Sequence, residues 1–316
     1  MVEDAVSGVE AGARGAFGLV VGVDRDGRAA ALRHAGAHMV VSDLRSIPVE
    51  GPAIPSALAA FGTIAWRLRD RRAAVFLDYD GTLTPIVDRP ERAVLSDAMR
   101  ATVDVLASLC RVAIVSGRDR ADVERLVGLA DLHYAGSHGF DISGPRGFTM
   151  QHEEGASRIP ELQRALAELR SRLEGVPGVL VEAKRYAIAV HYRLTPPDRV
   201  AEVAAAVDEV ARRMTGLRKT GGKMIFELRP RLDWDKGKAV LWLLQALDLD
   251  GPDVLPFYLG DDETDEDAFR ALRDRGIGIV VADERCRSFA AFGLRDPDEV
   301  CLFLSRLSDT ITASAR

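Results

Sequence analysis

The fold of this chain is decided by one stretch, Ala73-Ala74-Val75-Phe76-Leu77-Asp78-Tyr79-Asp80-Gly81-Thr82-Leu83. Its apolar first half is short enough for a buried strand. Asp78 and Asp80 therefore follow the carboxyl end of a strand, where open α/β sheets bind ligands. Gly81 permits a sharp turn there. One carboxylate can attack a substrate while the other transfers protons. An ordinary turn is the alternative for this motif taken alone.

A second apolar run, Val112-Ala113-Ile114-Val115, ends in Ser116-Gly117-Arg118. A serine at the end of a strand can donate a hydrogen bond to a phosphate oxygen. Its alternative role is to cap a helix predicted from about Asp119 to Val127, and this role is favoured when the segment is considered alone.

A lysine, Lys236, stands at the start of an apolar helix that is predicted to include residues 239–246. A cation at a helix N-terminus opposes the helix dipole. A nearby phosphate or carboxylate explains this lysine better than a structural role does. A solvent-exposed surface lysine remains the alternative.

A fourth apolar run, Phe257-Tyr258-Leu259-Gly260, precedes a dense group of acids that begins with Asp261 and Asp262 and includes Asp265. Carboxylate oxygens suit Mg²⁺, which binds through few carboxylates and keeps several waters. The remaining acids, Glu263, Glu266 and Asp267, suit the first turn of a helix. Asp261 is the preferred metal ligand of this group because it directly follows the strand.

In this order, the four segments resemble the haloacid dehalogenase-like phosphatase superfamily. The resemblance implies that Asp78 is the nucleophile that forms an aspartyl-phosphate and that Asp80 is the general acid and then the base. It implies that Ser116 and Lys236 position the phosphate. It also implies a Mg²⁺ cofactor, with these candidate ligands: Asp78, Asp80, Asp261, Asp262 and Asp265. Metal and lysine would neutralise the phosphoryl charge for a weak carboxylate nucleophile.

Five segments resemble, more specifically, the trehalose-6-phosphate phosphatase family. They are Asp78-Tyr79-Asp80-Gly81-Thr82-Leu83-Thr84-Pro85-Ile86, Ala135-Gly136-Ser137-His138-Gly139, Val181-Glu182-Ala183-Lys184, His191-Tyr192-Arg193 and Glu227-Leu228-Arg229-Pro230. The resemblance covers about three quarters of the chain, residues 72–307. It implies an enzyme of trehalose biosynthesis that hydrolyses trehalose 6-phosphate, with trehalose-6-phosphate synthase as a candidate partner.

Two alternatives stay open. The same chemistry could act on another sugar phosphate, such as sucrose phosphate or a glycosyl-glycerate phosphate. The chain could instead be an inactive sugar-phosphate sensor or a partner subunit of the synthase. The intact set of Asp78, Asp80, Lys236 and Asp261 argues against an inactive protein.

The composition agrees with a globular enzyme of one large or two modest domains. The chain has 316 residues, is 47% hydrophobic and carries a net charge of −6. This charge argues against nucleic acid as the main partner. Its three cysteines, Cys110, Cys286 and Cys301, have neither metal-ligand spacing nor a disulfide pattern, which predicts reduced core thiols in a cytoplasmic protein. No apolar run approaches the length of a membrane span, and no signal peptide is visible.

The fold class predicted is α/β, a doubly wound and mostly parallel sheet with an inserted α+β cap domain. More than a hundred residues separate Ser116 from Lys236, which is too many for one crossover helix. Helices are predicted at 158–173 and 199–214, with strands at 178–181, 186–192 and 224–228. The predicted domains are core residues 56–138, cap residues 139–233 and core residues 234–310.

The cap is predicted to read the sugar. Glu182 and Lys184 alternate along one strand, and Glu227 lies on another. Such side chains are typical both of sugar-hydroxyl binding and of solvated strand edges; the family resemblance favours trehalose hydroxyls. The other predicted substrate-binding residues are Asp78, Asp80, Gly81, Arg118 and His138. His138 lies between glycines at the predicted hinge, and a partly buried structural histidine is the alternative.

Residues 1–50 resemble the closing part of a β-phosphoglucomutase-like member of the same superfamily. A helix-like stretch precedes the predicted strand at residues 18–23. Glu3 and Asp4 lack the nucleophile, serine and lysine segments that a second active site would need. The proline-rich residues 46–55 are predicted to be a linker, and a helix is predicted at 56–71.

Overall fold

The computed structural model describes residues 1–15, 20–25, 27–43, 54–87, 90–222, 224–282 and 287–314. The chain forms two compact units, Met1–Ala53 and Ile54–Arg316. Most of the predicted linker, residues 46–55, lies outside the described residues, as do Gly18, Leu19 and Cys286.

In its described residues, the first unit is a small three-stranded parallel sheet with two helices. Its elements are β1 (Val2–Glu3), α1 (Val6–Arg14), β2 (Val21–Val23), α2 (Ala29–His34) and β3 (Met39–Val41). Val9, Val20 and Leu32 are fully buried and form its core. The resemblance of this unit to a β-phosphoglucomutase-like tail stays a prediction.

The second unit contains an eight-stranded sheet in the order β15-β14-β13-β4-β5-β6-β7-β8. The strands from β15 to β6 pair in parallel, and the last two are antiparallel. Their bounds are β4 Arg72–Leu77, β5 Arg111–Val115, β6 His133–Gly136, β7 Asp141–Gly144, β8 Phe148–Gln151, β13 Val254–Gly260, β14 Ile277–Val281 and β15 Phe292–Leu294.

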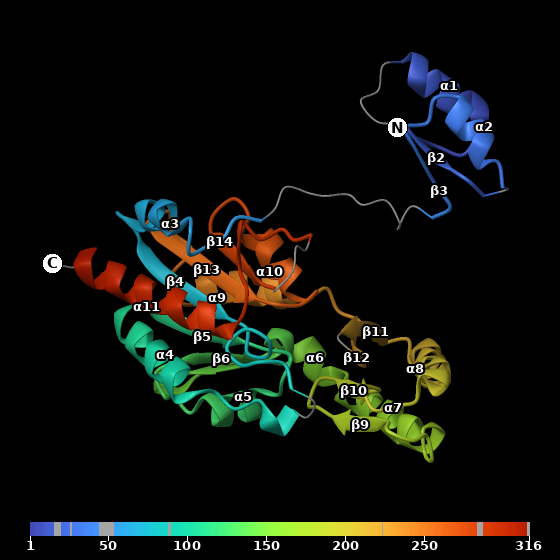
Figure 1. Cartoon of the computed structure of the whole chain (residues 1–316). Coiled ribbons are helices and arrows are strands. Elements are labelled where there is room, and N and C mark those ends of the chain that lie inside the picture. The colour runs from blue at the N-terminus through green and yellow to red at the C-terminus, as the bar shows by residue number, and fades with distance from the viewer. Residues whose placement is uncertain are drawn as a thin grey trace. The chain divides into compact units, whose positions relative to one another are not determined.

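Helices cover both faces of this sheet, which confirms the doubly wound class (Figure 1). Along β4, Val75 and Leu77 pack into one hydrophobic cluster while Ala74 and Phe76 pack into the other. This alternation is what a strand buried on both faces requires. The helices are α3 (Phe61–Leu68), α4 (Asp97–Leu109), α5 (Arg120–Val127), α9 (Lys236–Ala246), α10 (Asp265–Leu272) and α11 (Pro297–Ser314).

A second, four-stranded antiparallel sheet forms the cap, in the order β11-β12-β10-β9. Two long amphipathic helices bury their apolar sides against it, Leu162 and Val207 among them. The cap elements are α6 (Glu153–Ser157), α7 (Ile159–Arg172), β9 (Leu180–Ala183), β10 (Ile188–His191), α8 (Val200–Arg213), β11 (Leu217–Gly222) and β12 (Ile225–Pro230).

The predicted start of the cap at residue 139 is too early. Strands β7 and β8, residues 141–151, extend the large sheet and belong to the core. The strand β11 was not predicted, because Leu217–Gly222 contains Arg, Lys and two glycines and has weak apolar alternation. The helix predicted at 56–71 is also shorter than expected, since α3 covers only Phe61–Leu68.

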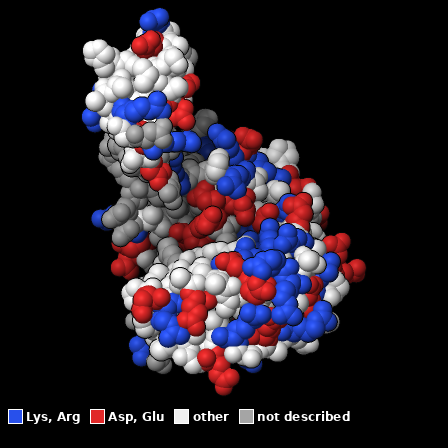
Figure 2. Space-filling model, turned by 90° about the vertical axis from the view of Figure 1, so that its right-hand side faces the viewer, with Lys and Arg blue, Asp and Glu red and all other residues white. Residues whose placement is uncertain are grey.

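The surface carries charges of both signs. Acidic side chains gather near the centre of the face drawn in Figure 2, and Lys and Arg lie among them and beside them. In the described part of the chain, no helix is both long and apolar enough to cross a membrane. Cys110 and Cys301 are free thiols, and burial raises the pKa of Cys110 to about 12.

Candidate active site

The predicted motifs meet at the carboxyl edge of the large sheet. β4 lies between β13 and β5, and its last residue, Leu77, is paired with Leu259 and with Ile114. Asp78 and Asp261, which follow β4 and β13, therefore start from neighbouring positions. Because parallel strands all end at one edge, four segments far apart in sequence share one site.

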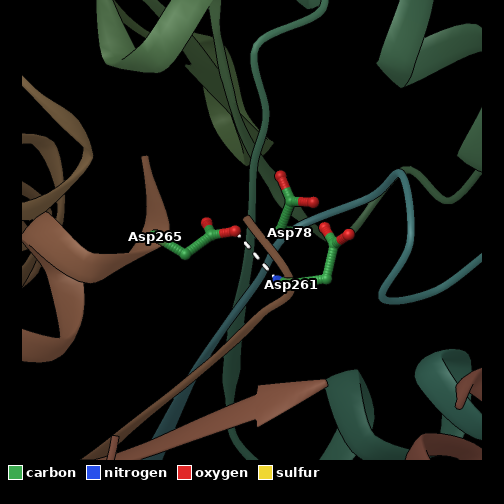
Figure 3. A group of neighbouring side chains, drawn as sticks. All are labelled: Asp78, Asp261 and Asp265. Carbon is green, nitrogen blue, oxygen red and sulfur yellow. Dashed lines mark hydrogen bonds between the residues drawn. The ribbon is translucent and has the colours of Figure 1, made fainter. Parts of the chain in front are cut away.

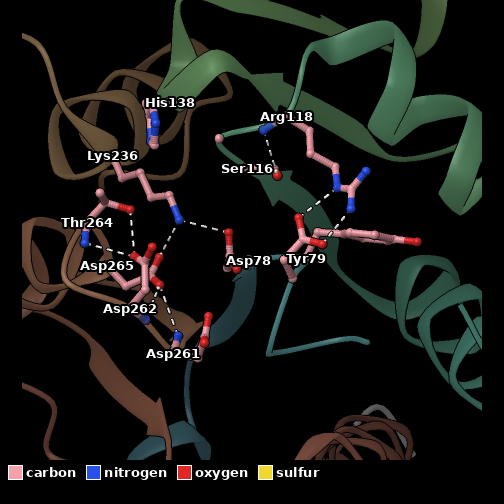
Figure 4. Close-up of polar contacts among 12 residues, drawn as sticks. Asp78, Tyr79, Ser116, Arg118, His138, Lys236, Asp261, Asp262, Thr264 and Asp265 are labelled. Atoms are coloured by element: carbon pink, nitrogen blue, oxygen red, sulfur yellow. Dashed lines mark hydrogen bonds and ion pairs between the residues drawn. The ribbon is translucent and has the colours of Figure 1, made fainter. Parts of the chain in front are cut away.

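Lys236 is buried at this edge between two carboxylates (Figure 4). Its Nζ donates to Asp78 Oδ1 at 2.8 Å and to Asp265 Oδ1 at 2.7 Å. Its side chain is 2% exposed, so the alternative of a solvent-exposed surface lysine is wrong. Burial raises the pKa of Asp78; Lys236 opposes this rise, and the neighbouring acids add to it.

Asp265 orients the loop after β13. Its Oδ1 accepts hydrogen bonds from Lys236 Nζ and from the hydroxyl of Tyr258, at 2.7 Å and 2.6 Å. Its Oδ2 accepts from the backbone N–H groups of Asp261 and Asp262, both at 3.0 Å. A carboxylate has about four lone-pair positions, and these four donors use them. Asp265 therefore serves to hold its neighbours in place.

Three aspartates could together hold a cation: Asp78, Asp261 and Asp265 (Figure 3). One oxygen from each lies within 4.8 Å of the others. The carboxylates outnumber the single buried ammonium of Lys236, so a divalent cation would balance their charge. Hard oxygen donors in small number fit Mg²⁺. Since the oxygens of Asp265 already accept four hydrogen bonds, Asp78 and Asp261 are the better direct ligands.

Two other predicted metal ligands, Asp80 and Asp262, are not part of this group. Asp80 accepts two hydrogen bonds from Arg118, from Nε and Nη2, each at 2.7 Å. Asp262 Oδ1 accepts from the N–H and the hydroxyl of Thr264, at 2.8 Å and 2.7 Å. Both carboxylates are thus committed to protein donors.

Arg118 anchors Asp80 beside the site. Its side chain is 10% exposed, it also pairs with Asp122 at 3.1 Å, and it lies over the ring of Tyr79. Burial would lower the pKa of the guanidinium, but Asp80 and Asp122 raise it above its usual value. The bidentate geometry with Asp80 is the arrangement in which arginine typically binds a carboxyl group.

Ser116 is buried in the loop after β5. Its hydroxyl oxygen accepts from the backbone N–H of Arg118 at 3.1 Å, and its carbonyl accepts from His138 N at 2.9 Å. The N-cap of α5 is Asp119, so the capping role considered for this serine is wrong.

Gly81 allows the first and fourth motifs to touch. Its φ is +83°, in the left-handed region, and a Cβ atom there would lie 2.1 Å from Asp261 Oδ2. Any side chain at this position would displace the carboxylate that is a candidate metal ligand.

Three predicted substrate-binding residues come together where the cap meets the core. Lys184 Nζ donates to Glu227 Oε1 at 3.0 Å and to the carbonyl of Gly117 at 3.1 Å. His138 Nε2 lies 3.2 Å from Glu227 Oε2. Burial raises the pKa of Glu227, but Lys184 and His138 bring it well below its usual range.

Glu182 lies nearby on the cap sheet. It and Glu227 both stand opposite Ala189, one on each side of β10, so they share a face of the sheet. Glu182 Oε2 lies 2.8 Å from His191 Nε2, and this hydrogen bond lowers the pKa of Glu182.

Tyr258 also supports the site, although none of the sequence motifs indicated it. Its ring is fully buried in β13, and its hydroxyl donates to Asp265. A buried tyrosine usually needs a hydrogen-bond partner, so a tyrosine inside an apolar strand that ends at the site was the available signal.

Known proteins are similar to this chain in sequence, and others are similar to it in fold. A family model described as trehalose-phosphatase matches residues 76–291. A trehalose-phosphate phosphatase of Mycobacterium tuberculosis is 46% identical over 311 residues, covering 96% of this chain and 79% of that protein. The trehalose-phosphate phosphatase of Mycobacterium marinum is 45% identical, with 94% and 78% covered.

A solved structure shares the fold of the second unit. The C-terminal domain of Candida albicans trehalose-6-phosphate phosphatase superposes with a TM-score of 0.72 at 24% identity. The superposition covers 81% of this chain and 99% of that domain.

Proposed function

Because the chain belongs to the trehalose-phosphatase family, we propose that it hydrolyses trehalose 6-phosphate to trehalose and inorganic phosphate. One observation carries this proposal. The buried Asp78–Lys236 pair stands beside Asp261, with the polar cap residues Lys184 and Glu227 at the same side of the core. The phosphate of the substrate binds between the ammonium of Lys236 and the carboxylates of Asp78 and Asp261. The polyhydroxyl sugar binds on the side of the cap.

The reaction proceeds in two displacements at phosphorus. A carboxylate oxygen of Asp78 attacks phosphorus, the bond from phosphorus to the sugar oxygen breaks, and Asp80 gives its proton to that oxygen. Water then attacks the aspartyl-phosphate, Asp80 takes a proton from it, and the bond between phosphorus and Asp78 breaks. Lys236 and the hydroxyl of Ser116 position the phosphoryl oxygens.

Arg118 donates a hydrogen bond to each oxygen of Asp80, and these bonds would have to loosen for Asp80 to act on the leaving oxygen. The substrate phosphate would compete with Asp80 for the guanidinium, since Arg binds both groups through the same forked geometry. Loss of this pair would free the oxygens of Asp80 for proton transfer.

We propose Mg²⁺ as the cofactor, which would be held by Asp78 and by Asp261, whose loop Asp265 orients. When bound, it offsets the negative charge that collects on the phosphoryl group.

Removal of divalent cations is expected to abolish phosphate release, and Mg²⁺ should restore it. Asp261→Ala should weaken Mg²⁺ binding by about tenfold or more, measured by isothermal titration calorimetry as well as by activity. Glu263→Ala is the matched control, because Glu263 is an exposed acid two residues further along. Full activity in metal-free buffer, or equal effects of the two variants on Mg²⁺ affinity, would contradict the assignment.

Glu182, Lys184 and Glu227 are proposed to bind the sugar hydroxyls. Lys184 and Glu227 are mostly buried and carry opposite charges, so they can offer both donors and acceptors. His138 is placed to join them, since its buried Nδ1 has no hydrogen-bond partner among the described residues.

Alanine at each of these three cap positions is expected to lower kcat/KM for trehalose 6-phosphate by roughly tenfold or more. The ratio of this value to kcat/KM for p-nitrophenyl phosphate should fall as well, because the small ester has no sugar to bind. A parallel fall on both substrates would mean that these residues support folding or cap closure instead of recognition.

A panel of sugar phosphates tests the substrate itself. Release of phosphate should be fastest from trehalose 6-phosphate, and faster release from sucrose phosphate or glycosyl-glycerate phosphate would overturn the proposal.

We further propose a cytoplasmic location and association with the synthase that makes trehalose 6-phosphate. Co-purification with that synthase tests the association.

A further inference from the structure

Asp119 stands at the N-cap of α5 but does not cap the helix. Aspartate at this position normally accepts a hydrogen bond from a backbone N–H of the first turn. Here its backbone is extended, with φ −60° and ψ 139°, and its side chain makes no such bond. Its carboxylate is directed to other parts of the protein.

The carboxylate of Asp119 joins the core to a turn in the cap. The backbone N–H of Arg185 donates to both of its oxygens, at 2.9 Å and 3.0 Å. The hydroxyl of Ser137 donates to Oδ1 at 3.0 Å. Arg185 belongs to the turn between β9 and β10, whereas Ser137 follows the core strand β6.

Each partner of Asp119 is next in sequence to a residue that touches Glu227. Lys184 precedes Arg185, and His138 follows Ser137. The two side chains contact opposite oxygens of the Glu227 carboxylate, at 3.0 Å and 3.2 Å. Asp119 thus holds a neighbour of each of these two side chains, through the backbone N–H of Arg185 and the hydroxyl of Ser137.

The Ser137–His138 turn needs such support. Both residues have positive φ, 50° and 57°, which is unfavourable for residues other than glycine. The hydrogen bond from Ser137 to Asp119, together with that from Ser137 N to Arg118 O at 2.6 Å, stabilises this conformation.

Further contacts hold the cap turn on the core. The guanidinium of Arg185 donates to Asp141 at 3.2 Å and to Gln151 at 3.1 Å, both in the core strands β7 and β8. Tyr186 is buried and stacks on Phe140, with ring centroids 5.5 Å apart. The base of the hairpin that carries Lys184 is therefore fixed to the core.

We propose that Asp119 is a positioning residue that sets Lys184 and His138 around Glu227 and so determines the affinity of the cap for its ligand. The part of this inference that concerns the sugar rests on the proposed function. The structural part, that Asp119 orders the turn at residues 183–187, does not depend on the substrate.

Hydrogen exchange in the absence of substrate tests the structural part. In Asp119→Ala, amides of a peptide covering residues 183–187 should exchange about tenfold faster than in the unchanged protein. Asp104→Asn, a change of the same charge at an exposed position of α4, should leave this exchange as it is. Unchanged exchange in Asp119→Ala would overturn the proposal whatever the substrate proves to be.

Kinetics test the functional part. Asp119→Ala should lower kcat/KM for trehalose 6-phosphate relative to p-nitrophenyl phosphate by about tenfold, chiefly through KM. Asp119→Asn keeps one acceptor oxygen, so its kcat/KM for trehalose 6-phosphate should fall less. Ser137→Ala removes the hydrogen bond from Ser137 to Asp119 and leaves the one from Arg185. It therefore replaces Asp119→Ala as the test variant if that protein does not fold.

A double-mutant cycle with Lys184→Ala provides the decisive comparison. If Asp119 acts through Lys184, its loss adds little once Lys184 is gone. Fully additive effects, or equal losses on both substrates, would overturn the positioning role. If the unchanged protein does not release phosphate from trehalose 6-phosphate, the proposed function fails and the exchange experiment still decides the role of Asp119.

Discussion

Replacement of Asp78 by Asn is expected to reduce turnover of trehalose 6-phosphate by at least about 10⁴-fold. The amide has the shape of the carboxylate, and its oxygen can still accept the hydrogen bond from Lys236. It cannot form the aspartyl-phosphate, because an amide oxygen is a poor nucleophile. We therefore expect a folded protein that binds substrate and does not hydrolyse it.

Steady-state phosphate release and thermal unfolding together check this result. Mass spectrometry must exclude deamidation of the introduced amide back to aspartate. In the unchanged protein, a borohydride quench during turnover should convert the phosphorylated aspartate to homoserine in the peptide that contains residue 78. Turnover by pure Asp78→Asn, or homoserine at another position, would refute the nucleophile assignment.

Replacement of Lys236 by Ala is expected to remove activity and to destabilise the second unit. The ammonium is buried between Asp78 and Asp265, at 2.8 Å and 2.7 Å. Without it, two carboxylates face each other in a buried site, and breaking a buried ion pair in this way costs about 3–5 kcal/mol. The loss of unfolding free energy should become smaller as the pH falls. Burial already raises the pKa of both acids, and their protonation removes the repulsion between them.

Urea unfolding of both proteins at acidic and neutral pH measures this effect. Lys238→Ala is the matched control, since Lys238 lies two residues further along α9, is 38% exposed and pairs with the solvent-exposed Asp233. The control should lose less than about 1 kcal/mol, as is usual for an exposed ion pair. Equal losses at positions 236 and 238 would contradict the proposed burial of the first lysine among acids.

Much of the core was predictable because its signals are local. The run before Asp78 forms β4, and the run before Ser116 forms β5, as their length and apolar character predict. Both strands are buried on two faces, so their sequences show continuous apolar runs bounded by polar ends. The long cap helices were also predicted, α7 from its amphipathic pattern and α8 from its strongly helical composition after two prolines.

The cap boundary could not be found by such signals. Strands β7 and β8 follow β6 through short turns and have no sequence feature that distinguishes a core strand from a cap strand. Their place is decided by hydrogen bonding of β7 to β6 and of β8 to β7. β11 was missed for a similar reason, since it is stabilised by pairing along its whole length with β12 and not by local propensity.

The different roles of the aspartates also depend on the tertiary structure. Five carboxylates were candidates for metal binding, and position in the sequence favoured only Asp261, which directly follows a strand. Asp80 lies against Arg118, and Asp262 is hydrogen-bonded to Thr264. The oxygens of Asp265 are occupied by four donors, including Tyr258. These partners come from distant positions in the chain or depend on loop geometry, so composition and spacing could not assign a separate role to each of the other acids.

The sequence by itself determined the fold class, the family and the segments that meet at the site, because strand ends and helix starts are local patterns whose positions along the chain survive folding. Only the tertiary structure decided which side chains touch. The ion pair of Lys236 with Asp78 and the bond from Arg185 to Asp119 join residues 158 and 66 positions apart. Contacts of such separation arise from the packing of whole elements, and no local preference encodes them.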